Sequence, residues 1–295
     1  MKILVTGATG FIGRHVIDQL LKLEHVSIIV TSSLIENLNF FYSDKKVLII
    51  EFDYYSVNFS QLDLFKYFNF PDKVIHLSWR GLPNYNSSFH MFINLKIEYD
   101  FLSNFIENGL KDLIVTGTCF EYGLLEGELN EGLISNPQNY YSLSKDSLRK
   151  MLKILQSKFQ FNLLWLRLFY IYGSGQKPQS IFGQLDIANQ NGDSYFNMSK
   201  GDQLRDYLTV EEVAYYMCEL SLFSNYDGIV NISSGKPTML IELVRNYMKK
   251  HGYNFKLNRG VLPYSVNEPF AFWGKNSLML NLINNSDKTY FGKQK

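Results

Sequence analysis

The chain has 295 residues and a net charge of +1, and 46% of its residues are hydrophobic. This length allows one large domain or a large domain with a small one, and the neutral balance gives no electrostatic case for nucleic acid or an anionic membrane as the main partner. Two cysteines exclude a disulfide framework and a cysteine-rich metal site, so we predict no metal. We see no signal peptide or membrane span and expect a cytoplasmic protein.

The first half of the chain alternates short apolar runs with longer amphipathic segments. The runs that predict buried strands are Lys2–Thr6, His25–Thr31, Val47–Phe52, Lys73–Leu77, Leu113–Thr116 and Asn162–Phe169. The segments with helical periodicity are Arg14–Leu23, Phe92–Asn108 and Ser142–Phe159. Because near-continuous apolar strands suit a parallel sheet covered on both faces, this alternation predicts an α/β fold with a doubly wound, Rossmann-type sheet.

The alternation ends after Gly173, where the chain becomes rich in Gly, Gln, Asn and Ser. The elements predicted beyond this point are helices at Ser180–Asn189, Val210–Leu222 and Leu240–His251, a strand at Gly228–Ile232, and irregular structure in the rest of Pro237–Lys295. We therefore predict a dinucleotide-binding domain at 1–173, to which 206–234 returns, and a small, discontinuous C-terminal substrate domain made of 174–205 and 235–295.

Three glycines, Gly7, Gly10 and Gly13, lie between the first predicted strand and the first predicted helix. Glycines at this spacing let the backbone turn tightly and approach a pyrophosphate, and the start of a helix offers free N–H groups and the positive end of its dipole. The strand–loop–helix context distinguishes this loop from an ordinary glycine-rich turn. We assign the three glycines, with Phe11 and Ile12, to a dinucleotide cofactor.

The second predicted strand ends in Val30-Thr31-Ser32-Ser33, without an acidic residue. In many dinucleotide folds an acid at this point binds the ribose hydroxyls of the adenosine. Ser32, together with Arg14 after the last glycine, is suited instead to a 2′-phosphate. The sequence therefore favours NADPH, and NADH bound without the acid remains open.

Tyr141 and Lys145 lie four residues apart, so on a helix they project from the same face. A neighbouring ammonium stabilises a phenolate and lowers the pKa of the tyrosine toward neutrality. Such a tyrosine can exchange a proton with a carbonyl or alcohol oxygen while a hydride moves. The alternative is a surface pair on a helix.

With these motifs the sequence resembles the extended short-chain dehydrogenase/reductase family, the group of sugar-nucleotide epimerases, dehydratases and reductases. The matching segments span nearly the whole chain: Gly7–Gly13, Asp53, His76–Trp79, Asn94, Thr118–Gly123, Tyr141/Lys145, Arg167–Gly173, Arg205–Tyr207 and Asn231–Gly235. The resemblance implies that Thr118 holds the C4 oxygen of the sugar. It implies that Tyr141 is the acid/base and that Lys145 binds the nicotinamide ribose.

The same resemblance implies roles for residues outside this trio. Asp53 would contact adenine, and Arg205 would meet the diphosphate of the substrate, which a guanidinium suits. The other assignments are Leu77, Ser78, Trp79 and Asn94 for the cofactor, and Arg80, Phe120 and Tyr170 for the substrate. Ordinary structural roles remain open for Asp53, Asn94 and Arg205. A homodimer through the helices at Phe92–Asn108 and Ser142–Phe159 is also expected from the family.

Departures from the family pattern narrow the reaction. The 4,6-dehydratases carry Asp-Glu directly after the threonine, where this chain has Cys119 and Phe120, so dehydration is disfavoured. Enzymes that epimerise before they reduce use a Cys two residues after the catalytic Ser and a His in the substrate region. Here Cys119 is out of register, and no His lies between His90 and His251. Reduction or epimerisation at C4 remains.

Three sequence segments resemble those of reductases that act on dTDP-4-keto-6-deoxyhexoses. Such reductases make dTDP-fucose or dTDP-6-deoxytalose for surface polysaccharide. The segments are Trp79–Tyr85, Thr116–Gly123 and Phe272–Gly274. The leading hypothesis is therefore an NAD(P)H-dependent reductase whose partner is a nucleotide-diphosphate sugar. A UDP-sugar 4-epimerase that retains NAD is the alternative. A third hypothesis is a non-catalytic NADP(H)-binding sensor, against which the intact Thr118, Tyr141 and Lys145 argue.

Overall fold

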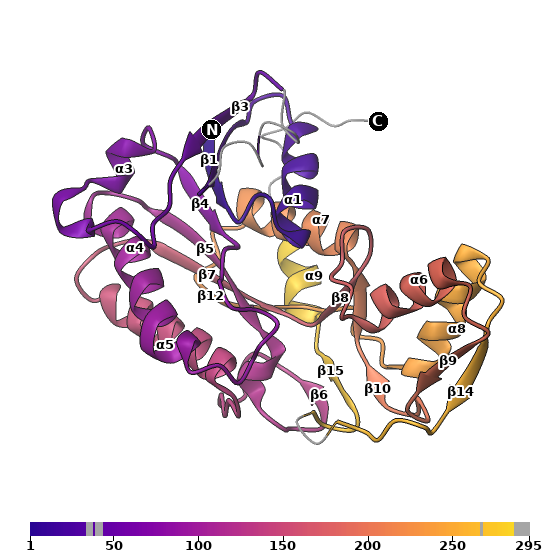
Figure 1. Cartoon of the computed structure of the whole chain (residues 1–295). Coiled ribbons are helices and arrows are strands. Elements are labelled where there is room, and N and C mark those ends of the chain that lie inside the picture. Colours follow the sequence, from indigo (N-terminus) through magenta and orange to yellow (C-terminus); the bar gives the residue numbers. More distant parts are fainter. Residues whose placement is uncertain (34–37, 39–43, 266–267, 286–295) are drawn as a thin grey trace.

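The computed structural model describes residues 1–33, 38, 44–265 and 268–285. Seven parallel strands form one central sheet between two layers of helices (Figure 1). In order across the sheet they are β12 (Gly228–Ile232), β7 (Asn162–Leu168), β5 (Asp112–Thr118), β4 (Lys73–His76), β1 (Lys2–Thr6), β2 (Ser27–Ser32) and β3 (Val47–Glu51). The predicted doubly wound sheet is confirmed. Its strand order reverses between β1 and β4, where sheets of this kind bind ligands.

Each face of the sheet has its own hydrophobic core. One core includes α1 (Phe11–Leu21), α7 (Val210–Phe223) and α9 (Ser277–Asn284), and the other includes α3 (Leu64–Tyr67), α4 (Leu95–Glu107) and α5 (Tyr140–Leu155). Alternate residues of β1 enter different cores, with Ile3 and Val5 in the first and Leu4 in the second. This alternation explains why the strands read as continuous apolar runs, since both of their faces are buried.

A smaller lobe lies beside the sheet and has a separate core that includes Phe182, Leu185 and Val244 (Figure 1). Its elements are α6 (Ile181–Asn191), β9 (Tyr195–Met198), β10 (Leu204–Arg205), β13 (Thr238–Met239), α8 (Leu240–His251) and β14 (Lys256–Arg259). Two short parallel pairs connect it to the sheet: β8 (Tyr170–Tyr172) with β11 (Tyr207–Thr209), and β6 (Gly127–Leu129) with β15 (Phe272–Gly274). In the described part of the chain, no helix has the length and apolar character needed to cross a membrane.

Helix α9 is the main difference from the elements predicted by sequence. The sequence predicts irregular structure there and places 235–295 in the substrate domain. In the structure Met279 and Ile283 pack in the core that contains α1 and α7, so this segment returns to the sheet. A helix of eight residues without a side-chain cap is marginal by itself, and tertiary packing stabilises it. Residues 286–295 lie outside the described part.

Candidate active site

The backbone of the glycine loop packs directly against neighbouring backbone atoms, which leaves no room for a side chain at Gly7 or Gly13. Gly7 has a φ of +70°, and its carbonyl oxygen accepts the N–H of Gly10 at 2.9 Å. A Cβ on Gly13 would lie 2.2 Å from that same oxygen, and a Cβ on Gly7 would lie 2.9 Å from the nitrogen of Ser78. The first turn of α1, with Phe11 and Ile12, therefore begins directly against the ends of β1 and β4. A helix start in this position suits a pyrophosphate, so the loop fits the predicted dinucleotide.

The two residues predicted to distinguish NADPH from NADH lie at the start of α1 and the end of β2. Ser32 is the last residue of β2, and no carboxylate follows it at Ser33. The Nε of Arg14 donates to the carbonyl oxygen of Thr9 at 3.0 Å, which anchors the guanidinium on the glycine loop. A cation thus remains beside the loop that fits the dinucleotide.

Arg80 lies beside Asp53, at the turn that follows β4. Its Nη2 is 2.6 Å from Oδ1 of Asp53, and its guanidinium lies 3.7 Å from the ring centre of Tyr55. Asn94 joins the same cluster, because its Oδ1 accepts the hydroxyl of Tyr55 and its Nδ2 donates to the carbonyl of Arg80. Arg80, predicted to bind substrate, is therefore grouped with Asp53 and Asn94, the residues predicted to bind cofactor.

The turn after β4 is fixed against β1. The hydroxyl of Thr6 accepts the backbone N–H groups of Leu77 at 3.3 Å and of Ser78 at 3.4 Å. The indole N–H of Trp79 donates to Nδ1 of His90 at 3.1 Å, which holds the ring in place. Leu77, Ser78 and Trp79 thus lie at the reversal point of the sheet, next to the glycine loop.

Thr118, Tyr141 and Lys145 come together beyond the carboxyl end of β5. Thr118 is the last residue of β5, and the other two lie one turn apart near the start of α5. Lys145 is only 1% exposed. Its ammonium donates to the carbonyl oxygen of Thr116 at 2.9 Å and lies 4.1 Å from the ring centre of Trp79. The predicted pair is therefore a buried pair, and the alternative of a surface pair is wrong.

Burial favours the neutral forms of both ionisable groups. It raises the pKa of the Tyr141 phenol well above its usual range, and the nearby Tyr85 and Glu121 add to the rise. Burial also lowers the pKa of Lys145 to about 8, against the opposing effect of Glu98 and Glu121. The direction of this shift is opposite to the lowering predicted from the spacing of Tyr141 and Lys145, because burial is the largest cause of the pKa shift at Tyr141. A neutral phenol is the form that donates a proton.

The buried ammonium predicts a pH-dependent stability. Because the pKa of Lys145 is about 8 in the folded protein and 10.5 in a model peptide, the unfolded chain binds more protons between these values, and stability rises with pH across this window. The free energy of unfolding of Lys145→Met, minus that of the wild type, should be about 2 kcal/mol larger at pH 7 than at pH 10. Urea unfolding of both proteins at several pH values measures this difference. A difference that does not change with pH would contradict the prediction.

A cavity of about 520 Å³ opens where the glycine loop, the end of β5 and the smaller lobe meet. The predicted site residues that line it are Phe11, Ile12, Thr118, Phe120, Tyr141, Tyr170 and Arg205. Phe120 contacts the rings of Tyr85 and Tyr170, with centroids 5.4 and 6.2 Å apart, so one wall is aromatic. The structure therefore joins part of each predicted set in one space, while Lys145 and the other predicted cofactor residues do not line it. Arg80 is the predicted substrate residue that does not line it.

Sequence reasoning missed other residues of this cavity, including Tyr85, Gln203, Tyr207 and Glu268. Glu268 forms an ion pair with Arg205, with 3.0 Å between Oε2 and Nη2. The Nη1 of Arg205 also donates to the carbonyl oxygens of Leu204 and Phe270 at 2.9 Å each. Arg205 is thus a buried cation at the cavity, and Glu268 is its ionic partner. No motif in the sequence marks Glu268.

Comparison with known proteins agrees with this geometry. A sequence profile of the NAD dependent epimerase/dehydratase family matches residues 3–232. The chain belongs to this family. The family is one of enzymes that use a nicotinamide dinucleotide, in agreement with the glycine loop. The resemblance described from the motifs is therefore confirmed. Separately, among the described residues no group of three or more His, Cys, Asp and Glu side chains could hold a metal ion.

Two curated relatives and one solved structure are similar to this chain over most of its length. The dTDP-6-deoxy-L-talose 4-dehydrogenase (NAD(+)) of Aggregatibacter actinomycetemcomitans is 30% identical over 93% of this chain and 99% of its own. The dTDP-4-dehydro-6-deoxyglucose reductase of Escherichia coli is 24% identical over 87% and 82%. The structure of UDP-glucuronic acid 4-epimerase from Bacillus cereus, in complex with UDP-glucuronic acid and NAD, has a TM-score of 0.82 at 23% identity over 97% and 94%. This likeness shows the shared fold.

Proposed function

We propose that the protein reduces the C4 keto group of a nucleotide-linked 4-keto-6-deoxyhexose, with dTDP as the nucleotide and NADPH as the preferred reductant. One observation carries the proposal: the hydroxyl-bearing residues Thr118 and Tyr141 share a single cavity with Phe11 and Ile12 of the cofactor loop. A carbonyl in this cavity has two hydroxyl groups to meet its oxygen, and the cofactor loop lies beside it.

The proposed chemistry needs a hydride and a proton. Reduced nicotinamide, when bound, supplies the hydride to C4 and is oxidised to NAD(P)⁺. Tyr141 donates its phenolic proton to the developing alkoxide, and water later returns a proton to the phenolate. The hydroxyl of Thr118 donates a hydrogen bond to the same oxygen. By family resemblance Lys145 holds the nicotinamide ribose, and its charge stabilises the transient phenolate.

The residues after Thr118 support reduction over dehydration. Burial raises the pKa of the Cys119 thiol well above its usual range, so it stays protonated, and Phe120 has no proton to exchange. Neither side chain can remove a proton at C5 and protonate a hydroxyl leaving C6. The names of the Aggregatibacter and Escherichia coli relatives, both of which refer to 6-deoxy sugars linked to dTDP, support the same substrate class.

The preference for NADPH rests on Ser32 and Arg14, because β2 itself ends in Thr31 and Ser32 without an acidic residue that would repel a 2′-phosphate. The name of the Aggregatibacter relative specifies NAD(+), so both dinucleotides belong in the assay.

We also propose a homodimer through the face of α4 and α5. Large apolar side chains are exposed on α5 and on the turn that precedes α4, among them Ile154 of α5 at 69% and Phe92 at 73%.

The decisive experiment mixes the purified protein with NADPH or NADH and enzymatically prepared dTDP-4-keto-6-deoxyglucose. The absorbance of the reduced nicotinamide should fall, faster with NADPH, and NMR of the product should show a C4 alcohol. Failure to oxidise either cofactor with any nucleotide form of this sugar would refute the proposal. Tightly bound NAD with turnover of a UDP-sugar and no added cofactor would identify the epimerase instead. Cofactor binding without turnover of any of these sugars would favour the sensor.

A further inference from the structure

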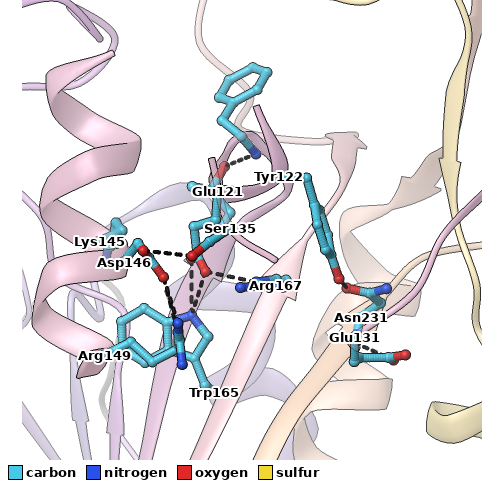
Figure 2. Close-up of polar contacts among 12 residues, drawn as sticks. Glu121, Tyr122, Glu131, Ser135, Lys145, Asp146, Arg149, Trp165, Arg167 and Asn231 are labelled. Atoms are coloured by element: carbon cyan, nitrogen blue, oxygen red, sulfur yellow. Dashed lines mark hydrogen bonds and ion pairs between the residues drawn. The ribbon is translucent and has the colours of Figure 1, made fainter. Parts of the chain in front are cut away.

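A buried carboxylate, Glu121, contacts the backbone of Thr118 and does not line the cavity. The side chain of Glu121 is fully buried and accepts hydrogen bonds from three donors. These are the backbone N–H of Thr118 at 2.9 Å, the indole N–H of Trp165 at 3.0 Å and the Nε of Arg167 at 2.7 Å. Figure 2 shows the Glu121, Trp165 and Arg167 side chains converging. Glu121 does not line the cavity, yet it contacts a residue that does.

Glu121 and Thr118 hold each other in a capping box around the short turn Cys119–Tyr122. The carboxylate accepts the N–H of Thr118, and the Thr118 hydroxyl oxygen accepts the N–H of Phe120 at 3.3 Å. Because this oxygen already accepts one donor, the rotation of the side chain is fixed and its own hydrogen remains available for donation. The box therefore sets the direction of the hydroxyl proposed to meet the substrate.

The end of β5 leaves room for this carboxylate only because residue 117 is a glycine. A Cβ on Gly117 would lie 2.4 Å from Oε1 of Glu121 and 2.2 Å from Nε1 of Trp165. Such distances are far below van der Waals contact, so any other residue would push the carboxylate away from Thr118. The glycine, the carboxylate and the donors of β7 thus form one packed unit.

We propose that Glu121 is a positioning residue: it holds the Thr118 hydroxyl in the direction needed by the reacting oxygen. The inference rests on the proposed function, in which Thr118 donates to that oxygen. Glu121 acts through the backbone of Thr118 and does not touch substrate. All three partners of its side chain are donors, so a carboxylate, which carries no hydrogen, satisfies them together.

Glutamine at this position cannot satisfy the same partners. Its single carbonyl oxygen can serve Thr118 or Arg167, and the charged guanidinium is the stronger competitor. In Glu121→Gln we expect the amide NH₂ to face the N–H of Thr118, which opens the capping box. The expected result is a fall in kcat of about tenfold, with KM and the Kd for NADPH within about threefold of wild type.

Removing the competitor should rescue the variant. In the double variant Glu121→Gln/Arg167→Met the glutamine oxygen is free to return to Thr118, so kcat should recover to within about threefold of wild type. The matched control is Asp146→Asn. Asp146 is another buried carboxylate, bound to Arg149 at 2.7 Å and Ser135 at 2.8 Å (Figure 2). We expect Asp146→Asn to lower the melting temperature without a tenfold loss of kcat.

A Thr118→Ala background distinguishes a positioning role of Glu121 from a general loss of structure in the Glu121 variant. If Glu121 acts through Thr118, then Glu121→Gln should cost nothing further in a Thr118→Ala protein. Losses that multiply, or an unchanged kcat in Glu121→Gln, would overturn the inference. Should Glu121→Gln fail to fold, Glu121→Asp keeps the charge beside Arg167 but is too short to reach Arg167 and the N–H of Thr118 together. It replaces Glu121→Gln in both backgrounds, with the same outcomes required.

A second readout keeps this inference separate from the proposed function, because it needs no turnover. NMR of protein labelled with ¹³C at the tyrosine ring, with the Tyr141 signal assigned by its loss in Tyr141→Phe, reports the hydroxyl that faces Tyr141. Because the Thr118 side chain affects the ionisation of the Tyr141 hydroxyl, this signal should shift in Thr118→Ala. Glu121→Gln should shift the same signal, and this effect should vanish in the Thr118→Ala background. A wild-type signal in Glu121→Gln would overturn the inference whether or not the enzyme reduces a keto sugar.

Discussion

Replacing Tyr141 by phenylalanine should abolish sugar reduction and leave NADPH binding nearly intact. Removing the proton donor should lower kcat about 10³-fold, within the range typical of general acids. The ring of Tyr141 contacts Trp79, Tyr85 and His90 at centroid distances of 5.9, 5.5 and 5.6 Å. Phenylalanine keeps these contacts, so the fold and the pocket should persist. Single-turnover rates and a fluorescence titration with NADPH measure the two quantities.

The neighbouring tyrosine supplies the matched control for this experiment. Tyr140 belongs to the same helix but is 41% exposed and does not line the cavity. Tyr140→Phe removes an identical hydroxyl one residue away and should retain wild-type kcat. More than a tenth of the wild-type activity in Tyr141→Phe would show that another group delivers the proton. Loss of NADPH binding in that variant would show that the hydroxyl serves the cofactor.

Replacing Gly13 by alanine should weaken NADPH binding at least about 100-fold, because a small misplacement at such a site has large effects. The added Cβ would lie 2.2 Å from the carbonyl oxygen of Gly7 and 2.9 Å from the Cα of Ala8. Both are backbone atoms of the loop, so α1 must move away from β1. The N–H groups at the start of the helix then leave the position that suits a pyrophosphate. Isothermal titration calorimetry with NADPH measures the loss.

Two further glycine variants keep this prediction testable. At Gly10 a Cβ would lie 3.0 Å from the same carbonyl oxygen, so Gly10→Ala should fold and bind NADPH with a smaller loss if Gly13→Ala proves unstable. At Gly132 the Cβ would meet only the side chain of Asn130, at 3.2 Å, so Gly132→Ala should bind normally. Wild-type affinity in both loop variants would refute the assignment of this loop to the cofactor.

Most of the sheet was predictable because its signals are local. A strand buried on both faces is a run of apolar residues, and this pattern placed β1, β7 and β12 within a residue or two of their ends. The amphipathic pattern of α8 matched both of its ends, Leu240 and His251. Helix α9 was not predicted because eight residues carry little periodicity, and because contacts with α7 and β12 stabilise the helix.

Part of the aromatic character of the chain also has an explanation. Aromatic residues form 16% of the sequence, which is compatible with an aromatic pocket or with simple bias. The structure places Phe120, Tyr170 and the previously unassigned Tyr85 and Tyr207 around the cavity. Many others fill the core beside α4, such as Phe101. The composition therefore reflects both a pocket wall and ordinary core packing.

The sequence by itself determined the features that depend on neighbouring residues: the glycine loop, the one-turn spacing of Tyr141 and Lys145, and the missing acid after β2. Tertiary structure alone decided the pairing of distant charges. Arg80 meets Asp53, Arg167 meets Glu121 and Arg205 meets Glu268 across 27, 46 and 63 residues of chain, respectively. It also decided the direction of the pKa shift at Tyr141, because desolvation depends on which side chains the fold packs around a group.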